Sequence, residues 1–154
     1  MDNRIQISDN FTLYDVQYNE QAVRLGIGNE VTTDAQVDNA RAVAIGILEP
    51  LIAEGHQFHI TSWFRSEALE KDYSRNAYVQ WCIANRRHIR PESWRDYLEL
   101  KQHQSCCAVT LRSRNTKGLF EFIQTLPEFD TMQNKTHWIS VSFTSNNQKR
   151  VIHE

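Results

Sequence analysis

The sequence has no long apolar segment and no strong excess of either charge. No run approaches the roughly 20 apolar residues that a membrane-spanning helix needs, and the first residues, MDNRIQISDNF, contain no apolar core of a secretory signal. The formal net charge is only -2, whereas nucleic acid and anionic membranes attract proteins with clustered Lys and Arg. We therefore expect no membrane partner and no nucleic-acid partner.

Cysteine is also scarce, and its number is odd. The three thiols are Cys82, Cys106 and Cys107, and without a secretory signal this pattern favours reduced cysteines and a cytoplasmic location. A disulfide between neighbours in the sequence is strained and rare, so we expect Cys106 and Cys107 to be small core side chains. Internal repeats and low-complexity tracts are absent, and the length favours a single domain spanning 1–154.

Apolar residues at intervals of three and four predict the helices. The clearest case covers 37–52, begins after an N-cap at Thr32 or Thr33, and stops near Gly55. Pro50 lies inside this helix and is expected to end or kink it, because proline has no backbone N–H. Further helices are predicted at 11–25 (opened by Thr12 and closed at Gly26), 67–85, 92–101 and 116–126.

Alternating side chains predict the strands, of which QFHITSWF at 57–64 is the clearest. Its two expected faces are Phe58, Ile60 and Ser62 against His59, Thr61 and Trp63. Strands are also expected at 106–113 and 137–143, and 148–154 is a fourth short strand or a tail. Because helices and strands do not alternate strictly, the sequence favours an α+β fold with a small, mostly antiparallel sheet packed with helices.

The segment 67–100 contains no glycine and is rich in aromatic residues. It is expected to form two helices separated near Pro91, since proline suits the first turn of a helix. Its aromatic side chains either belong to a protein interface, where aromatic residues and arginine are enriched, or form the core of an enlarged domain. They are Tyr73, Tyr78, Trp81, Trp94 and Tyr97.

Four motifs occur in an order that is typical of one enzyme family. They are FTLYDV at 11–16, ILEPL at 47–51, ITSWFRSEAL at 60–69 and WISVSF at 138–143. These segments resemble the F-T-L-S-E, V-L-E-P-L, I-T-S-G-Y-R-S-x-x-L and W-V-H-V-S-F motifs of zinc D-alanyl-D-alanine peptidases. That family includes carboxypeptidases, D,D-dipeptidases and phage endolysins. The resemblance covers nearly the whole chain and implies a DD-peptidase-like fold, with about 67–100 as a helical insertion.

The resemblance also implies a zinc site, from which this chain departs. In the family, three side chains hold the metal, which lowers the pKa of its bound water to roughly 7. The ligand motif S-x-H-x-x-G-x-A-x-D falls on KQHQSCCAVT, where His103 keeps the histidine, Cys106 replaces the glycine and Thr110 replaces the aspartate. Ser140 replaces the third ligand, and no glutamate stands beside His137 to act as general base. We expect no catalytic residue and no bound metal, with His103, Thr110, Ser140 and His137 as vestigial positions.

Other chemistry near His103 stays open at this point. A metal site formed by His103, Cys107 and His137 is conceivable, as is a thiolate at Cys106 or Cys107 paired with His103. The spacing of these residues selects neither arrangement over simple packing. The substrate side of the family's cleft is kept as Arg65, which in the family faces the substrate carboxylate, together with Ser62. An arginine after a strand also pairs with acids or caps carbonyl groups.

Three functions follow from the resemblance. The first is a catalytically inactive peptidase-like protein, a structural or interaction component of a phage virion or tail. It would be made in the host cytoplasm and assembled with copies of itself or other subunits. The second is a zinc-dependent peptidoglycan peptidase or endolysin with a non-standard metal site. The third is a module that binds cell-wall carbohydrate or peptide without cleaving it, using the cleft around Arg65.

Overall fold

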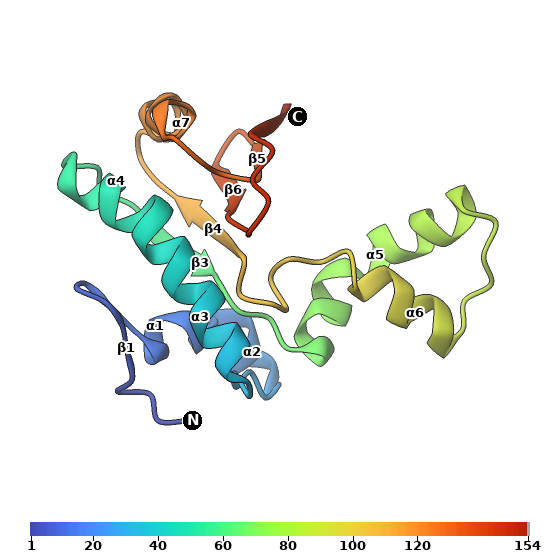
Figure 1. Cartoon of the computed structure of the whole chain (residues 1–154). Helices are drawn as coiled ribbons and strands as arrows, with labels where there is room; N and C mark the ends of the chain where they lie inside the picture. The colour runs from blue at the N-terminus through green and yellow to red at the C-terminus, as the bar shows by residue number, and fades with distance from the viewer. Residues whose placement is uncertain (154) are drawn as a thin grey trace.

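The fold centres on a five-stranded mixed sheet (Figure 1). The computed structural model describes residues 1–153, and the strand order is β3-β4-β6-β5-β7. β5 and β7 run parallel, while the other neighbouring strands of this sheet run antiparallel. The α+β class and a mostly antiparallel sheet are therefore confirmed. The strands are β3 (His59–Ser62), β4 (Ala108–Arg112), β5 (Thr131–Asn134), β6 (Trp138–Ser142) and β7 (Arg150–His153).

Three of these strands lie where the sequence places them, and the C-terminal residues form a strand as expected. β5 was not predicted, because its four residues, TMQN, are too few and too polar for an alternating pattern to stand out. It forms through pairing on both sides, with β6 and with β7. Tertiary contacts rather than local sequence therefore determine this strand.

The N-terminal segment differs from the single helix expected over 11–25. A short antiparallel hairpin leads into two short helices. Asn19 interrupts the helix, because its side chain accepts a hydrogen bond from the backbone N–H of Ala22 (3.0 Å) and begins a new helix. The expected ends are confirmed, with Thr12 as the first N-cap and Gly26 closing the second helix at a left-handed φ of 68°. The elements are β1 (Gln6–Ser8), β2 (Phe11–Thr12), α1 (Leu13–Gln17) and α2 (Glu20–Leu25).

A long helix follows, and Pro50 does not end it. Thr33 is its N-cap, and its last residues precede Gly55, where φ is 88°. Over 44–48 the helix widens to π-type hydrogen bonding, directly before the proline that cannot donate. Its parts are α3 (Asp34–Val43), η1 (Ala44–Leu48) and α4 (Glu49–Ala53). Neither this helix nor another in residues 1–153 has both the length and the apolarity to cross a membrane.

One face of the sheet is buried under this long helix and α7 (Thr116–Thr125). Fully burying one Leu or Ile contributes about 1.5 to 3 kcal/mol, so this layer is the main source of stability. At one point the helix backbone itself meets an aromatic ring, since a Cβ built on Gly46 would lie 2.5 Å from a ring carbon of Phe143. Representative members of the main core are Ile47, Leu48, Leu51, Val109, Leu111, Leu119, Ile123, Met132, Ile139 and Val141.

The segment expected to be a helical insertion forms a helical hairpin that stands to one side of the sheet (Figure 1). Its helices are α5 (Glu67–Ala84) and α6 (Pro91–Leu98), close to the ranges expected from the sequence. Tyr78, Cys82 and Tyr97 form a second core, with Trp81 and Trp94 packed against it. Tyr78 and Trp94 stack with ring centroids 3.6 Å apart. The aromatic residues of this segment therefore form the hairpin's own core, with the exception of Tyr73, which lies in the cleft described next.

Candidate functional site

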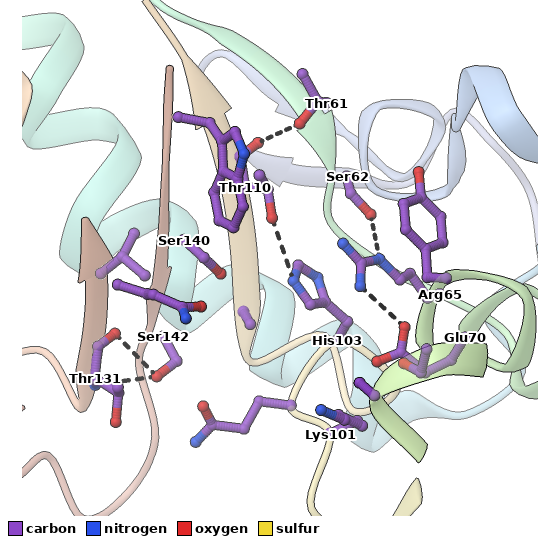
Figure 2. A pocket seen from close by; sticks show the side chains of 18 of the residues that line it. Thr61, Ser62, Arg65, Glu70, Lys101, His103, Thr110, Thr131, Ser140 and Ser142 are labelled. Atoms are coloured by element: carbon purple, nitrogen blue, oxygen red, sulfur yellow. Dashed lines mark hydrogen bonds and ion pairs between the residues drawn. The ribbon is translucent and has the colours of Figure 1, made fainter. Parts of the chain in front are cut away.

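A cleft of about 590 Å³ lies between the open face of the sheet and the first turns of α5 (Figure 2). The alternation of β4 and β6 explains its polar floor, because one set of side chains faces the main core and the other faces the cleft. Cross-strand pairing places Thr110 beside Ser140 and Arg112 beside Trp138. The alternate residues of these two strands that face the cleft are Ala108, Thr110, Arg112, Trp138, Ser140 and Ser142.

A β-bulge redirects the end of β3, so the faces expected for 57–64 are wrong beyond Ile60. The register against β4 shifts between Ile60 and Ser62, and a bulge of this kind re-aims the following side chains. Ser62 consequently joins Thr61 at the cleft, whereas Trp63 turns into the main core and is fully buried. An alternating pattern alone cannot reveal the residue at which such a shift occurs.

His103 enters the cleft from the loop between α6 and β4. Its Nδ1 lies 2.8 Å from the carbonyl oxygen of Trp63, and its Nε2 lies 3.3 Å from the hydroxyl of Thr110. Because a carbonyl oxygen only accepts, Nδ1 donates and Nε2 accepts from Thr110. Burial, followed by the positive charges of Arg65 and Lys101, lowers the pKa of His103 to about 3. The imidazole is therefore neutral, and both of its nitrogens have partners.

Arg65 is held by a network of side chains, most of them buried, at the other wall of the cleft (Figure 2). Its Nε donates to Ser62 Oγ (2.8 Å), its Nη1 donates to Glu70 (2.9 Å), and its guanidinium lies 4.0 Å from the ring centroid of Tyr73. Asn19 donates to both Ser62 and Tyr73 at 3.3 Å. The ion pair with Glu70 confirms one of the structural roles expected for Arg65, which was pairing with an acid. Its Nη2 makes no hydrogen bond within residues 1–153 and is available to a ligand.

Three of the four positions expected from the sequence to be vestigial lie together in this cleft. Thr110 is hydrogen-bonded to His103 and is the direct cross-strand neighbour of Ser140. His137 is not part of the group, because it is exposed in the turn before β6 and lies outside the cleft. Zinc prefers imidazole, thiolate and carboxylate ligands. One imidazole and two hydroxyl groups do not fit this preference, so we derive no metal-dependent step from them.

The cysteines lie outside the cleft. Cys106 belongs to the main core, burial raises the pKa of its thiol and that of Cys107, and neither thiol is hydrogen-bonded to His103. The site of His103, Cys107 and His137 is not assembled, and within residues 1–153 no three His, Cys, Asp or Glu side chains are grouped as metal ligands. Cys106 has a φ of 64°. This left-handed conformation favours glycine, which is the residue that the resembling motif has there.

The residues that the sequence did not single out include two that line the cleft, Glu70 and Arg112, and one that supports its wall, Asn19. Glu70 lies on the first turn of the helix that follows Arg65, so a search for an acid near that arginine would have found it. Arg112 lies two positions after Thr110 and therefore shares its face of β4. Nothing in the sequence around Asn19 indicates a role in the site, because only the folded chain brings its side chain to Ser62.

The left-handed backbone at Cys106 predicts an unusual order of stability. We expect Cys106→Gly to be at least as stable as Cys106→Ala, because alanine retains a Cβ that this φ disfavours. Urea unfolding of both variants gives the comparison. Ala40→Gly, in a buried helical position, is the control and is expected to lose about 1 kcal/mol. The prediction would be contradicted if Cys106→Ala were more stable than Cys106→Gly by the same free energy of unfolding that Ala40→Gly loses.

The neutral, buried imidazole of His103 predicts weaker folding in acid. Its pKa is about 3 in the folded chain and roughly 6.5 when unfolded, so the unfolded chain binds more protons between these values. The contribution of neutral His103 to the free energy of unfolding is fully present above pH 6.5. Below that pH the free energy of unfolding is expected to fall by up to about 1.4 kcal/mol per pH unit. Urea unfolding between pH 5 and 8 should show a shallower dependence for His103→Gln. His137→Gln, an exposed change outside the cleft, is the control.

Comparison of the chain with protein-family models, with curated proteins and with solved structures gives no match. The geometry of the cleft and the resemblance of the motifs therefore carry the functional argument.

Proposed function

We propose that this chain is a catalytically inactive peptidase-like protein that acts as a structural or interaction component. The observation on which this proposal rests is the hydrogen bonding of His103. The hydroxyl of Thr110 donates to Nε2 of His103, the nitrogen that could otherwise bind a metal, and Ser140 lies beside Thr110 on the next strand. These are the positions at which the resemblance implies metal ligands, and their convergence in one cleft supports a DD-peptidase-like scaffold. A lone imidazole holds zinc poorly, because affinity comes from several preorganised donors.

The resemblance to phage members supports a setting in a virion or tail, with several copies assembled together. The helical hairpin supports an assembly role, because it stands away from the sheet and is stabilised by its own core. Its exposed apolar side chains include Ile83 and Ile89, at 66% and 63% exposure. Removing such apolar side chains from water is favourable, so they would stabilise contact with a neighbouring subunit that covers them.

A second candidate is a non-cleaving module that binds a cell-wall peptide. The observation that favours it is the guanidinium of Arg65, which is fixed by Ser62 and Glu70 yet keeps Nη2 available in the cleft. Lys101 lines the same cleft and adds a second positive charge. A peptide carboxylate could bind there without being cleaved.

Restoring the missing donors tests the proposed descent of the site. We expect the wild type to bind zinc weakly, and Thr110→Asp combined with Ser140→His to bind it at least about 100-fold more tightly, because three preorganised donors then surround one point. Thr110→Asn with Ser140→His is the matched control that lacks the carboxylate. Calorimetric zinc titration gives the affinities.

The wild-type protein supplies the opposing outcome of this experiment. Near-stoichiometric zinc that is lost in His103→Ala, together with cleavage of a D-alanyl-D-alanine peptide, would establish the zinc peptidase instead. Binding of a muropeptide without turnover would favour the second candidate. If the designed triple-donor variant binds zinc no better than its control, the three positions do not have the geometry of a former metal site.

The assembly role predicts association of the purified chain or capture by a partner subunit. Light scattering after size-exclusion chromatography is expected to give a mass above that of the 18.1 kDa monomer. Replacing Ile83 and Ile89 with serine should shift the mass toward the monomer, because it removes exposed apolar area. Serine at exposed Val23 is the control. A strict monomer at all concentrations, with no partner chain, would count against the role.

A further inference from the structure

The end of the cleft at Arg112 contains polar groups that have no partner within residues 1–153. No hydrogen bond joins the Arg112 guanidinium, the Trp138 indole N–H, the Gln133 amide or the Ser140 hydroxyl to another described group. None of these atoms is buried and unsatisfied, so they are open to the cleft. The end at Arg65 differs, because its side chains are hydrogen-bonded to one another.

Strand pairing places these groups on one continuous patch. Arg112 and Trp138 are cross-strand partners on β4 and β6, and Ser140 pairs with Gln133 on β5. Directly opposed side chains in a sheet have Cβ atoms about 4.5 to 5.5 Å apart, so a ligand the size of one sugar ring can touch all four. We call these four residues the Arg112 subsite.

The charge of the patch favours an anion. The carboxylate that lines the cleft is Glu70, and it is already paired with Arg65 at 2.9 Å. Arg112 therefore has no acid partner among the described residues that line the cleft. A guanidinium binds a carboxylate through two parallel hydrogen bonds.

The other members of the subsite favour a ring that carries hydroxyl groups. Trp138 offers an apolar face with a polar edge, while Gln133 and Ser140 donate to and accept from hydroxyl groups. An extended peptide fits less well, because β4 and β6 are interior strands whose backbone groups are already paired. Recognition here depends on side chains.

We propose that the Arg112 subsite binds an acidic monosaccharide unit, with its carboxylate on Arg112 and its ring against Trp138. The hydroxyl groups of the sugar bind Gln133 and Ser140. This binding goes beyond the proposed function and does not require that the chain be catalytic or lack catalysis.

The proposal can be tested with two sugars that have the same pyranose ring, by NMR titration of the isotope-labelled full chain. D-glucuronate and D-glucose differ at C6, where one has a carboxylate and the other a hydroxymethyl group. We expect glucuronate to bind with a Kd of about 1 mM, as is usual for so small a ligand, and glucose about tenfold more weakly. Arg112→Gln should abolish this difference, and Trp138→Leu should weaken both sugars.

Arg114→Gln, an exposed change outside the cleft, is the control and should bind like the wild type. A dispersed NMR spectrum shows that each variant is folded. Binding of succinate as tightly as glucuronate would overturn the sugar assignment, and so would unchanged discrimination in Arg112→Gln or no shift with glucuronate. The readout involves no zinc and no cleavage, so its failure is distinguishable from failure of the proposed function.

Discussion

The buried ion pair between Arg65 and Glu70 joins four parts of the chain at one point. Arg65 follows the bulged end of β3, and Glu70 lies on the first turns of α5. Their side chains are only 14% and 2% exposed, so each charge depends on the other for the stabilisation that water would otherwise provide. Ser62 and Asn19 extend the contact to α2. The backbone N–H of Arg65 also donates to the carbonyl of His103.

This network has a direct effect on the shape of the cleft. The helical hairpin has its own aromatic core, so its position relative to the sheet is not set by the main core. The pair between Arg65 and Glu70 supplies a fixed attachment where α5 leaves β3. A ring stacked on a guanidinium adds to it, because Tyr73 lies 4.0 Å from Arg65. The wall of the cleft is thus held by polar contacts, while its floor is held by the hydrophobic layer beneath.

Local patterns in the sequence predicted most of the elements and missed the places where tertiary contacts decide. The helices at 67–85, 92–101 and 116–126 have periodic apolar faces, and each is present with small shifts at its ends. Asn19 broke a helix that apolar spacing alone made continuous. Pro50 failed to break one, because the π-type turn before it accommodates the missing donor.

The candidate site was predictable to the extent that motifs carried it. Ser62, Arg65, His103, Thr110 and Ser140 all line one cleft, although they come from separate segments. The resemblance supplied this grouping, and composition alone could not have done so. The acid that pairs with Arg65 and the open polar groups around Arg112 became visible only with the register of the sheet, since strand pairing is not written in any single segment.

Gly46 allows the long helix to pack directly against the ring of Phe143. The bare backbone at this residue accommodates the ring of Phe143, and the neighbours on either side, Ile45 and Ile47, carry branched side chains. A side chain at position 46 would therefore overlap the ring unless the helix or Phe143 moved. The distance between the long helix and the strand end that carries Phe143 thus depends on the absence of a single carbon atom.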